Sequence, residues 1–168
     1  RRAPPAAAWI GSVRSVTPAG RLIYPQVPRG LALDDLADWG HAGQFSQPGA
    51  FFSRAALERA GPADESLHYA FDVDLFLRLA RQGRFVAVDA FLAEETIHSA
   101  AKTFAQRGKS LAELHLIQIR NGFEPIAFRR MSEELQDLET LRRGTLVEKA
   151  RWQAGIALRS AFDLLRRR

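Results

Sequence analysis

Cysteine is missing altogether from the 168 residues of this sequence. Disulfide bonds and metal sites built on thiolates are therefore excluded for this chain, and the composition fits a reducing compartment. Long hydrophobic runs are also missing, since no stretch approaches the roughly 18 consecutive apolar residues that a membrane-spanning helix needs. Hydrophobic residues nevertheless make up 46% of the chain, which is enough to bury the core of one ordinary globular domain.

Lysine is scarce, because only Lys102, Lys109 and Lys149 contribute to the 24 basic residues. The net charge is +5, but residues 151–168 hold five arginines and a single aspartate, so most of the excess lies in that segment. The remainder of the chain is nearly neutral. The basic balance therefore does not indicate a polyanion, and we expect no nucleic-acid partner.

The first hundred residues alternate between β-prone and helix-prone runs. Two β-prone runs flank a turn that contains Pro18 and Gly20, which predicts a hairpin. The pattern then predicts further elements in the following order: a short helix in "LALDDLADW", a strand in "AFFS", a helix between Ser53 as N-cap and Gly61, a helix in "FDVDLFLRLARQG" closed by Gly83, and a strand in "RFVAVDAFLA". This order of elements predicts α/β construction.

From about Phe104 onward the pattern is helical, in three segments that end at Gly122, at Gly144 and at the C-terminus. We therefore predict two regions, an α/β region over residues 1–103 and a helical extension over residues 104–168.

Two aspartates, Asp72 and Asp74, stand at the start of the apolar helix-like run "FDVDLFLRLA". On a helix, residues two apart point about 200° away from each other, so the two carboxylates are expected to have separate roles. Asp74 lies four residues before Arg78, a spacing that favours an ion pair along one helix face. Asp72 directly follows a loop, where it could serve as an N-cap or could place a free carboxylate in a cleft as a general base.

Three motifs resemble the second half of the catalytic domain of inverting glycosyltransferases with the GT-A fold, the family-2 group of sugar transferases. They are "QPGAFFSR", "DESLHYAFDVDLFLRLA" followed by "GRFVAVD", and "IHSAAKT", and the similarity runs from about Trp9 to Thr103. The resemblance implies that Asp72 is the general base. It would take the proton of an acceptor hydroxyl, whose oxygen displaces the nucleoside diphosphate from the anomeric carbon with inversion.

The same resemblance implies three residues on the donor side, Gln47, His98 and Lys102. His98 occupies the place of a family histidine that helps to hold a divalent metal on the departing diphosphate, and imidazole together with oxygen ligands suits Mg²⁺ or Mn²⁺. Gln47 matches a loop near the acceptor and the donor sugar, although an ordinary loop role is an equal alternative. Tyr69 is expected to pack rather than to bind substrate.

In this family the first half binds the nucleotide and ends in an Asp-x-Asp motif, which is expected shortly before "AAAWIGSV" and is not found there in this sequence. The predicted fold class is therefore α/β, a partial GT-A fold that lacks the N-terminal nucleotide-binding half and is followed by C-terminal helices. Without that half, we expect an exposed apolar sheet face, marginal stability and no sugar transfer by these 168 residues alone.

The C-terminal stretch "ARWQAGIALRSAFDLLRRR" predicts an amphipathic basic helix, in which Leu158, Phe162 and Leu165 share one face. Such a helix could dock on the domain, or it could bind an anionic membrane surface and serve a lipid-linked or saccharide acceptor. We accordingly expect a cytoplasmic protein, either free or peripheral at the inner face of a membrane. The alternative to an enzyme is a non-catalytic basic helical module that binds a polyanion or a protein, for which Asp72 would be only a cap.

Overall fold

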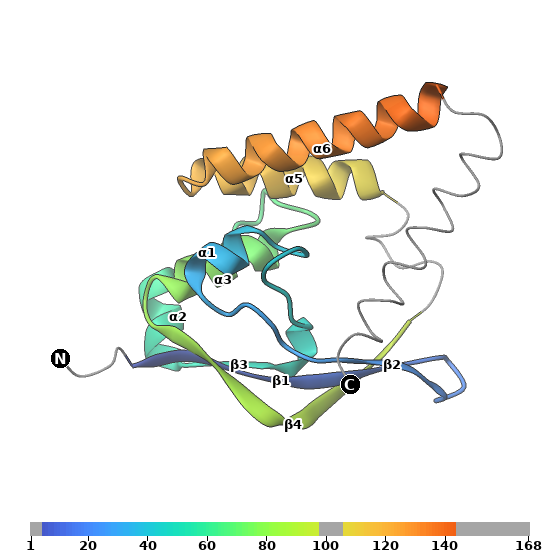
Figure 1. Cartoon of the computed structure of the whole chain (residues 1–168). Helices are drawn as coiled ribbons and strands as arrows, with labels where there is room; N and C mark the ends of the chain where they lie inside the picture. Colours follow the sequence, from blue (N-terminus) through green and yellow to red (C-terminus); the bar gives the residue numbers. More distant parts are fainter. Residues whose placement is uncertain (1–4, 98–105, 144–168) are drawn as a thin grey trace. The chain divides into compact units, whose positions relative to one another are not determined.

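In the computed structural model of the chain, residues 5–97 and 106–143 are described. The chain divides into two compact units, residues 1–127 and residues 128–168, which are treated separately below. The predicted boundary at residues 103 and 104 falls within a segment outside the described residues, so it stays a prediction. Figure 1 gives the element labels used from here on.

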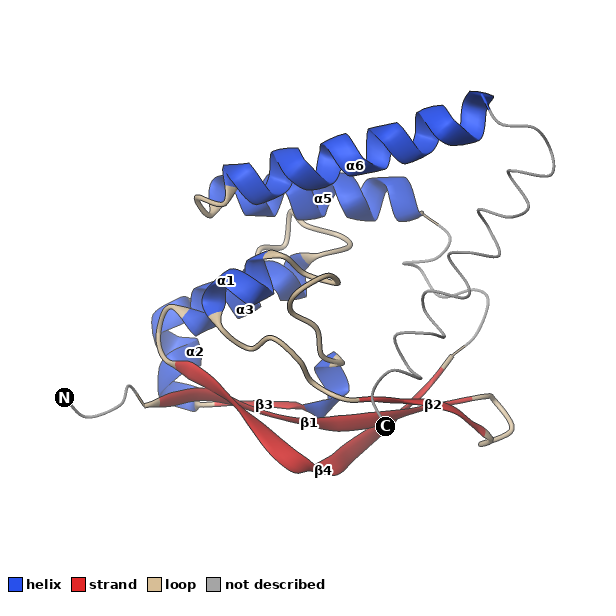
Figure 2. Ribbon diagram, viewed as in Figure 1, coloured by secondary structure: helices blue, strands red, loops and turns tan. Residues whose placement is uncertain are grey.

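A mixed four-stranded sheet forms the base of the first unit, with β1 (Ala6–Val16) at its centre. One edge of β1 pairs in parallel with β4 (Arg84–Thr96), from Ala6 opposite Arg84 to Val16 opposite Thr96. The other edge pairs antiparallel with two shorter strands, β2 (Leu22–Gln26) and β3 (Ala50–Phe52). The sheet is drawn in red in Figure 2. The expected hairpin of the first two strands is confirmed, and the turn between them contains Gly20 at φ 75°.

Three short helices pack on one face of this sheet, namely α1 (Leu33–Ala37), α2 (Arg54–Ala60) and α3 (Phe71–Ala80) (Figure 1). The α/β class predicted from the sequence is therefore confirmed. A 3₁₀ turn, η1 (Gln47–Gly49), leads into β3, and α5 (Arg107–Arg120) follows the segment outside the described residues. The helix α6 (Glu124–Arg143) begins in the first unit and continues into the second.

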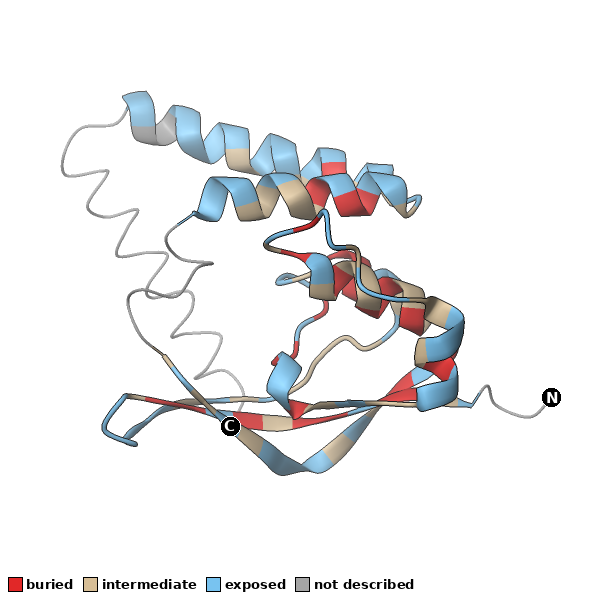
Figure 3. Cartoon of the chain, turned by 180° about the vertical axis from the view of Figure 1, so that it is seen from behind, coloured by how far each residue is buried: buried red, intermediate tan, exposed pale blue. Residues whose placement is uncertain are grey.

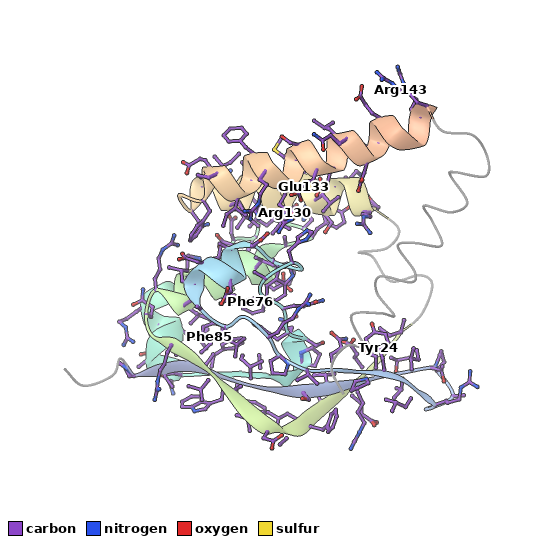
Figure 4. All side chains as sticks on the ribbon, in the orientation of Figure 1. Tyr24, Phe76, Phe85, Arg130, Glu133 and Arg143 are labelled. Carbon is purple, nitrogen blue, oxygen red and sulfur yellow. The ribbon has the colours of Figure 1, made fainter. Side chains whose placement is uncertain are left out.

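The core lies between the sheet and α3, because this helix turns Phe76, Leu77 and Leu79 inward. Phe76 is its centre: the Phe76 ring centroid lies 4.6 Å from that of Phe45 and 5.9 Å from that of Phe52. Figure 4 shows Phe76 and Phe85 pointing into this layer. Burying such aromatic rings favours the packing of α3 onto the sheet.

Gly83 ends the turn between α3 and β4, as expected, and the structure shows why glycine is needed. A Cβ at this position would lie 2.3 Å from the backbone oxygen of Pro5 and 3.2 Å from the backbone nitrogen of Ala7. Only glycine permits this approach between the turn and the start of β1 without displacing the backbone.

The other face of the sheet carries exposed apolar side chains. Trp9 lies opposite Phe51 on one neighbouring strand and opposite Val86 on the other, and Trp9 and Phe51 are 42% and 59% exposed. Figure 3 shows exposed and half-buried residues along β4. Within the described residues of the first unit, no helix covers this face.

One predicted cap forms differently from the expectation. Ser53 is the N-cap residue of α2, but its side chain makes no capping hydrogen bond. Its backbone N–H donates instead to the carbonyl oxygen of Ala7 at 2.8 Å, which ties the start of α2 to β1. Gly61 follows the helix at φ 79°, in the left-handed region that favours glycine.

The C-terminal helical region agrees in part with the sequence pattern. The segment expected to be helical up to Gly122 contains α5, whereas α6 starts at Glu124, earlier than the pattern indicated, with Pro125 in its first turn. In the second unit, Arg130 pairs with Glu133 at 2.6 Å along α6 (Figure 4). The predicted terminal helix from residue 145 onward lies outside the described residues.

Candidate functional site around Asp72

The start of α3 carries the acidic pair, and the structure separates the two carboxylates as the helical spacing predicted. Asp74 Oδ2 accepts a hydrogen bond from Arg78 Nε at 2.8 Å, so the expected i, i+4 ion pair is confirmed. Asp74 Oδ1 also accepts from Asn121 Nδ2 at 3.3 Å. Arg78 in turn donates to the carbonyl oxygens of Ala60 and Gly61 at the end of α2. Asp74 is therefore part of a bridge that joins three helices.

Asp72 has a different environment, although it lies only two residues away. It is the second residue of α3, and the N-cap position belongs to Ala70, so the interpretation of Asp72 as an N-cap is wrong. Its Oδ1 atom accepts from the Val73 backbone N–H at 2.9 Å. Within residues 5–97 and 106–143, no further hydrogen bond to a side-chain oxygen of Asp72 is formed, so its Oδ2 atom is less engaged than Oδ1.

Partial burial of Asp72 raises the pKa of its carboxyl group, and the backbone N–H groups of Val73 and Asp72 itself oppose that shift only in part. A carboxylate with a raised pKa is a stronger base once it has lost its proton. This is the direction that general-base catalysis needs near neutral pH.

The loop before α3 begins with a local turn that the "DES" motif builds. Asp64 Oδ1 accepts from the backbone N–H of Ser66 at 2.9 Å and from its hydroxyl at 2.6 Å. These two bonds are the main reason that the pKa of Asp64 lies below its ordinary value, and Arg120 lies 3.8 Å away. Asp64 thus shapes the loop, and its carboxylate is already engaged by these donors.

The end of the same loop is held by Glu113, a residue that no sequence motif indicates. Its Oε1 atom accepts from the His68 N–H at 2.8 Å, and its Oε2 atom accepts from the N–H groups of Tyr69 at 2.6 Å and Ala70 at 3.0 Å. Desolvation alone would raise the pKa of Glu113, but the three backbone donors outweigh it and the pKa is lowered. Its partners are main-chain groups about 45 residues earlier, so no sequence pattern could reveal them.

Tyr69 contributes a second connection to the same part of the chain, because its hydroxyl donates to Gln106 Oε1 at 2.7 Å, directly before α5. The side chain is half-buried. The packing role expected for Tyr69 therefore includes a polar anchor that the sequence did not indicate.

The donor-side residues lie elsewhere or outside the described structure. Gln47 is exposed in η1 and makes no hydrogen bond with Asp72 within the described part of the chain. Its neighbour Ser46 donates to Glu95 Oε2 at 2.6 Å, and Glu95 Oε1 accepts from the buried Ser15 hydroxyl at 3.0 Å and from Gln26. The turn that carries Gln47 is thus fastened to the end of the sheet.

His98 and Lys102 lie outside the described residues, so their expected roles stay predictions. In the described ranges, 5–97 and 106–143, no group of three or more histidine, aspartate or glutamate side chains could hold a metal ion. The expected Mg²⁺ or Mn²⁺ therefore has no such ligand set in the part of the chain that the structure describes. No helix in that part is both long enough and apolar enough to span a bilayer.

Comparison of the sequence with models of known protein families and with curated proteins finds no match.

Proposed function

We propose that this chain carries the acceptor side of an inverting glycosyltransferase of the GT-A type, in which Asp72 is the general base. The observation that supports this proposal is the partly engaged carboxylate of Asp72, whose Oδ1 accepts from the Val73 N–H while Oδ2 is less engaged. A residue that served only helix α3 would gain nothing from burial that raises its pKa.

The reaction is the one that the resemblance implies, and the partly engaged carboxylate of Asp72 supports it. Asp72 accepts the proton of an acceptor hydroxyl as the oxygen of that hydroxyl forms a bond to the anomeric carbon of a nucleotide sugar. The bond from that carbon to the diphosphate breaks on the opposite side, and the nucleoside diphosphate leaves with the electron pair. The new glycosidic bond has the inverted configuration, and Asp72 ends the step protonated.

The test is Asp72→Asn in the complete gene product, assayed with a panel of uridine, guanosine and thymidine diphosphate sugars for release of nucleoside diphosphate in the presence of saccharide or lipid-linked acceptors. We expect turnover to fall about 1000-fold, since a positioned general base contributes roughly 10² to 10⁴. Asn is nearly isosteric and keeps the Val73 hydrogen bond, so circular dichroism should show an unchanged fold.

Asp89→Asn is the matched control, because Asp89 is exposed on β4 and the substitution is chemically the same. Equal turnover in Asp72→Asn and wild type would overturn the base assignment. An absence of nucleoside diphosphate release by the wild type with every donor would overturn the transferase proposal itself.

The binding-module alternative makes the opposite prediction for the same variant. A basic module would bind an anionic polymer in a salt-sensitive manner, with no loss in Asp72→Asn. The segment on which it depends, residues 151–168, lies outside the described residues.

A further inference from the structure

The loop that leads into α3 and Asp72 is held by a single carboxylate, which accepts hydrogen bonds from three consecutive backbone N–H groups. The donors belong to His68, Tyr69 and Ala70, and the acceptor is Glu113 on α5. Both carboxylate oxygens are used, with N···O distances between 2.6 and 3.0 Å. Hydrogen bonds to an ionised acceptor are about twice as strong as neutral ones, so this contact fixes the backbone rather than merely touching it.

The position of the contact matters more than its strength. Ala70 is the N-cap residue of α3, and Asp72 follows two residues later. The N-cap residue makes no side-chain capping bond, so no cap fixes the direction in which the chain enters α3. Glu113, which belongs to a different helix, binds the backbone at this point instead.

Further bonds tie α5 to the two ends of α3. Before its first turn, Gln106 accepts from the Tyr69 hydroxyl, and at its end Asn121 donates to Asp74 and accepts from Arg81. In its last turn the buried Gln118 donates to the carbonyl oxygen of Ala37 on α1 at 2.8 Å. A helix outside the region of family resemblance is therefore fastened at several points to the elements around Asp72.

We propose that Glu113 is a positioning residue for Asp72: by binding the N–H groups of residues 68–70, it sets the place and direction of the Asp72 carboxylate relative to the acceptor hydroxyl. This inference rests on the proposed function, in which Asp72 is the base. Glu113 itself bonds to the backbone and takes no part in the proton transfer.

The experiment compares Glu113→Gln, Glu113→Ala and the matched control Glu65→Gln, all in the complete gene product. Glu65 lies in the same loop, is exposed, and undergoes the same chemical change. We expect kcat to fall about 10- to 100-fold in Glu113→Gln and further in Glu113→Ala, with little change in KM, because misplacement of a reacting group acts on the transition state. Gln keeps the size and one acceptor oxygen, so it preserves the fold if the alanine variant does not.

Amide hydrogen exchange provides a measurement that does not depend on activity. In Glu113→Gln, the amides of His68, Tyr69 and Ala70 should exchange faster than in wild type, while the core amides of α3 should be unchanged. Faster exchange with unaltered kcat would overturn the positioning role and leave Asp72 as the base. Unaltered exchange would show that the contact is not formed in solution, which also overturns it.

A failure of the transferase proposal looks different. In that case the wild type releases no nucleoside diphosphate with any donor, whatever the exchange rates of residues 68–70. A fall in kcat with little change in KM for Glu113→Gln, without a corresponding fall for Glu65→Gln, supports the positioning role.

Discussion

Asp72 and Asp74 are two carboxylates on one turn of α3 with opposite surroundings. Asp74 has a complete set of donors, Arg78 and Asn121, and connects α2, α3 and α5. Asp72 is half-buried, with one of its oxygens engaged by the backbone and with a raised pKa. The comparison shows how to tell a structural acid from a candidate catalytic one, because the first is fully satisfied by its neighbours and the second is left partly unsatisfied at a cost in stability.

The largest effect on stability is expected at Asp74. Asp74→Ala should lower the free energy of unfolding by about 2–3 kcal/mol, since it leaves the guanidinium of Arg78 partly buried without its carboxylate. The Asp74 and Arg78 side chains are only 16% and 24% exposed, which limits solvent screening. Urea unfolding of the variant measures the loss, and Arg54→Ala, which breaks an exposed i, i+4 pair, is the control. Equal losses in the two variants would contradict the bridging role of Asp74.

Asp72→Asn should behave in the opposite way, with stability at pH 7 equal to or above that of the wild type. The pKa of Asp72 in the folded chain is raised above its ordinary value of 3.8. The ionised carboxylate therefore lowers the stability of the folded chain at pH values above this raised pKa. As the pH falls below about 3.8, Asp72 is protonated in both the folded and unfolded states and the cost disappears.

The measurement is the difference in melting temperature between Asp72→Asn and wild type as a function of pH. It should be positive at neutral pH and should shrink toward zero on acidification. A destabilised Asn variant at pH 7 would indicate that Asp72 serves the helix rather than a reaction.

The smallest effect on stability is expected at Glu113, and its dependence on pH is the reverse of that expected for Asp72. Because its pKa in the folded chain lies below the ordinary value of 4.5, its contribution to stability is present above that value and is lost as the pH falls further. The side chain is partly exposed, so the contribution is about 1 kcal/mol or less after screening. Thermal unfolding of Glu113→Gln and wild type between pH 7 and pH 3 should converge at the acidic end. Parallel curves would contradict the contact with residues 68–70.

Local patterns predicted the features that depend on neighbours in the sequence. The turn at Gly20, the helix closed by the turn at Gly83 and the pairing of Asp74 with Arg78 all follow from spacings of a few residues. The sequence also placed Asp72 at the start of a helix, but it could not decide whether the carboxylate capped that helix, because the decision depends on where the first hydrogen-bonded turn begins.

Contacts across the fold escaped prediction for a physical reason. Glu113 binds main-chain N–H groups, which every residue except proline possesses, so its partners leave no trace in side-chain identity. The hydrogen bonds of Glu95 to Ser15 and Ser46 likewise depend on the pairing of β1 with β4 and on the path of a loop. The residues next to Ser15 or Ser46 in the sequence do not indicate that Glu95 is the hydrogen-bond partner.

The central position of β1 also governs how this chain can fold. β1 completes its hairpin with β2 early, but its parallel partner β4 comes late, and Ser15 and Glu95 are 80 positions apart in the sequence. Closing so long a loop costs entropy before any of the pairing is gained. During synthesis, one edge of β1 therefore waits without a partner until β4 emerges from the ribosome, and we expect this interval to be the time when the chain most needs protection from aggregation.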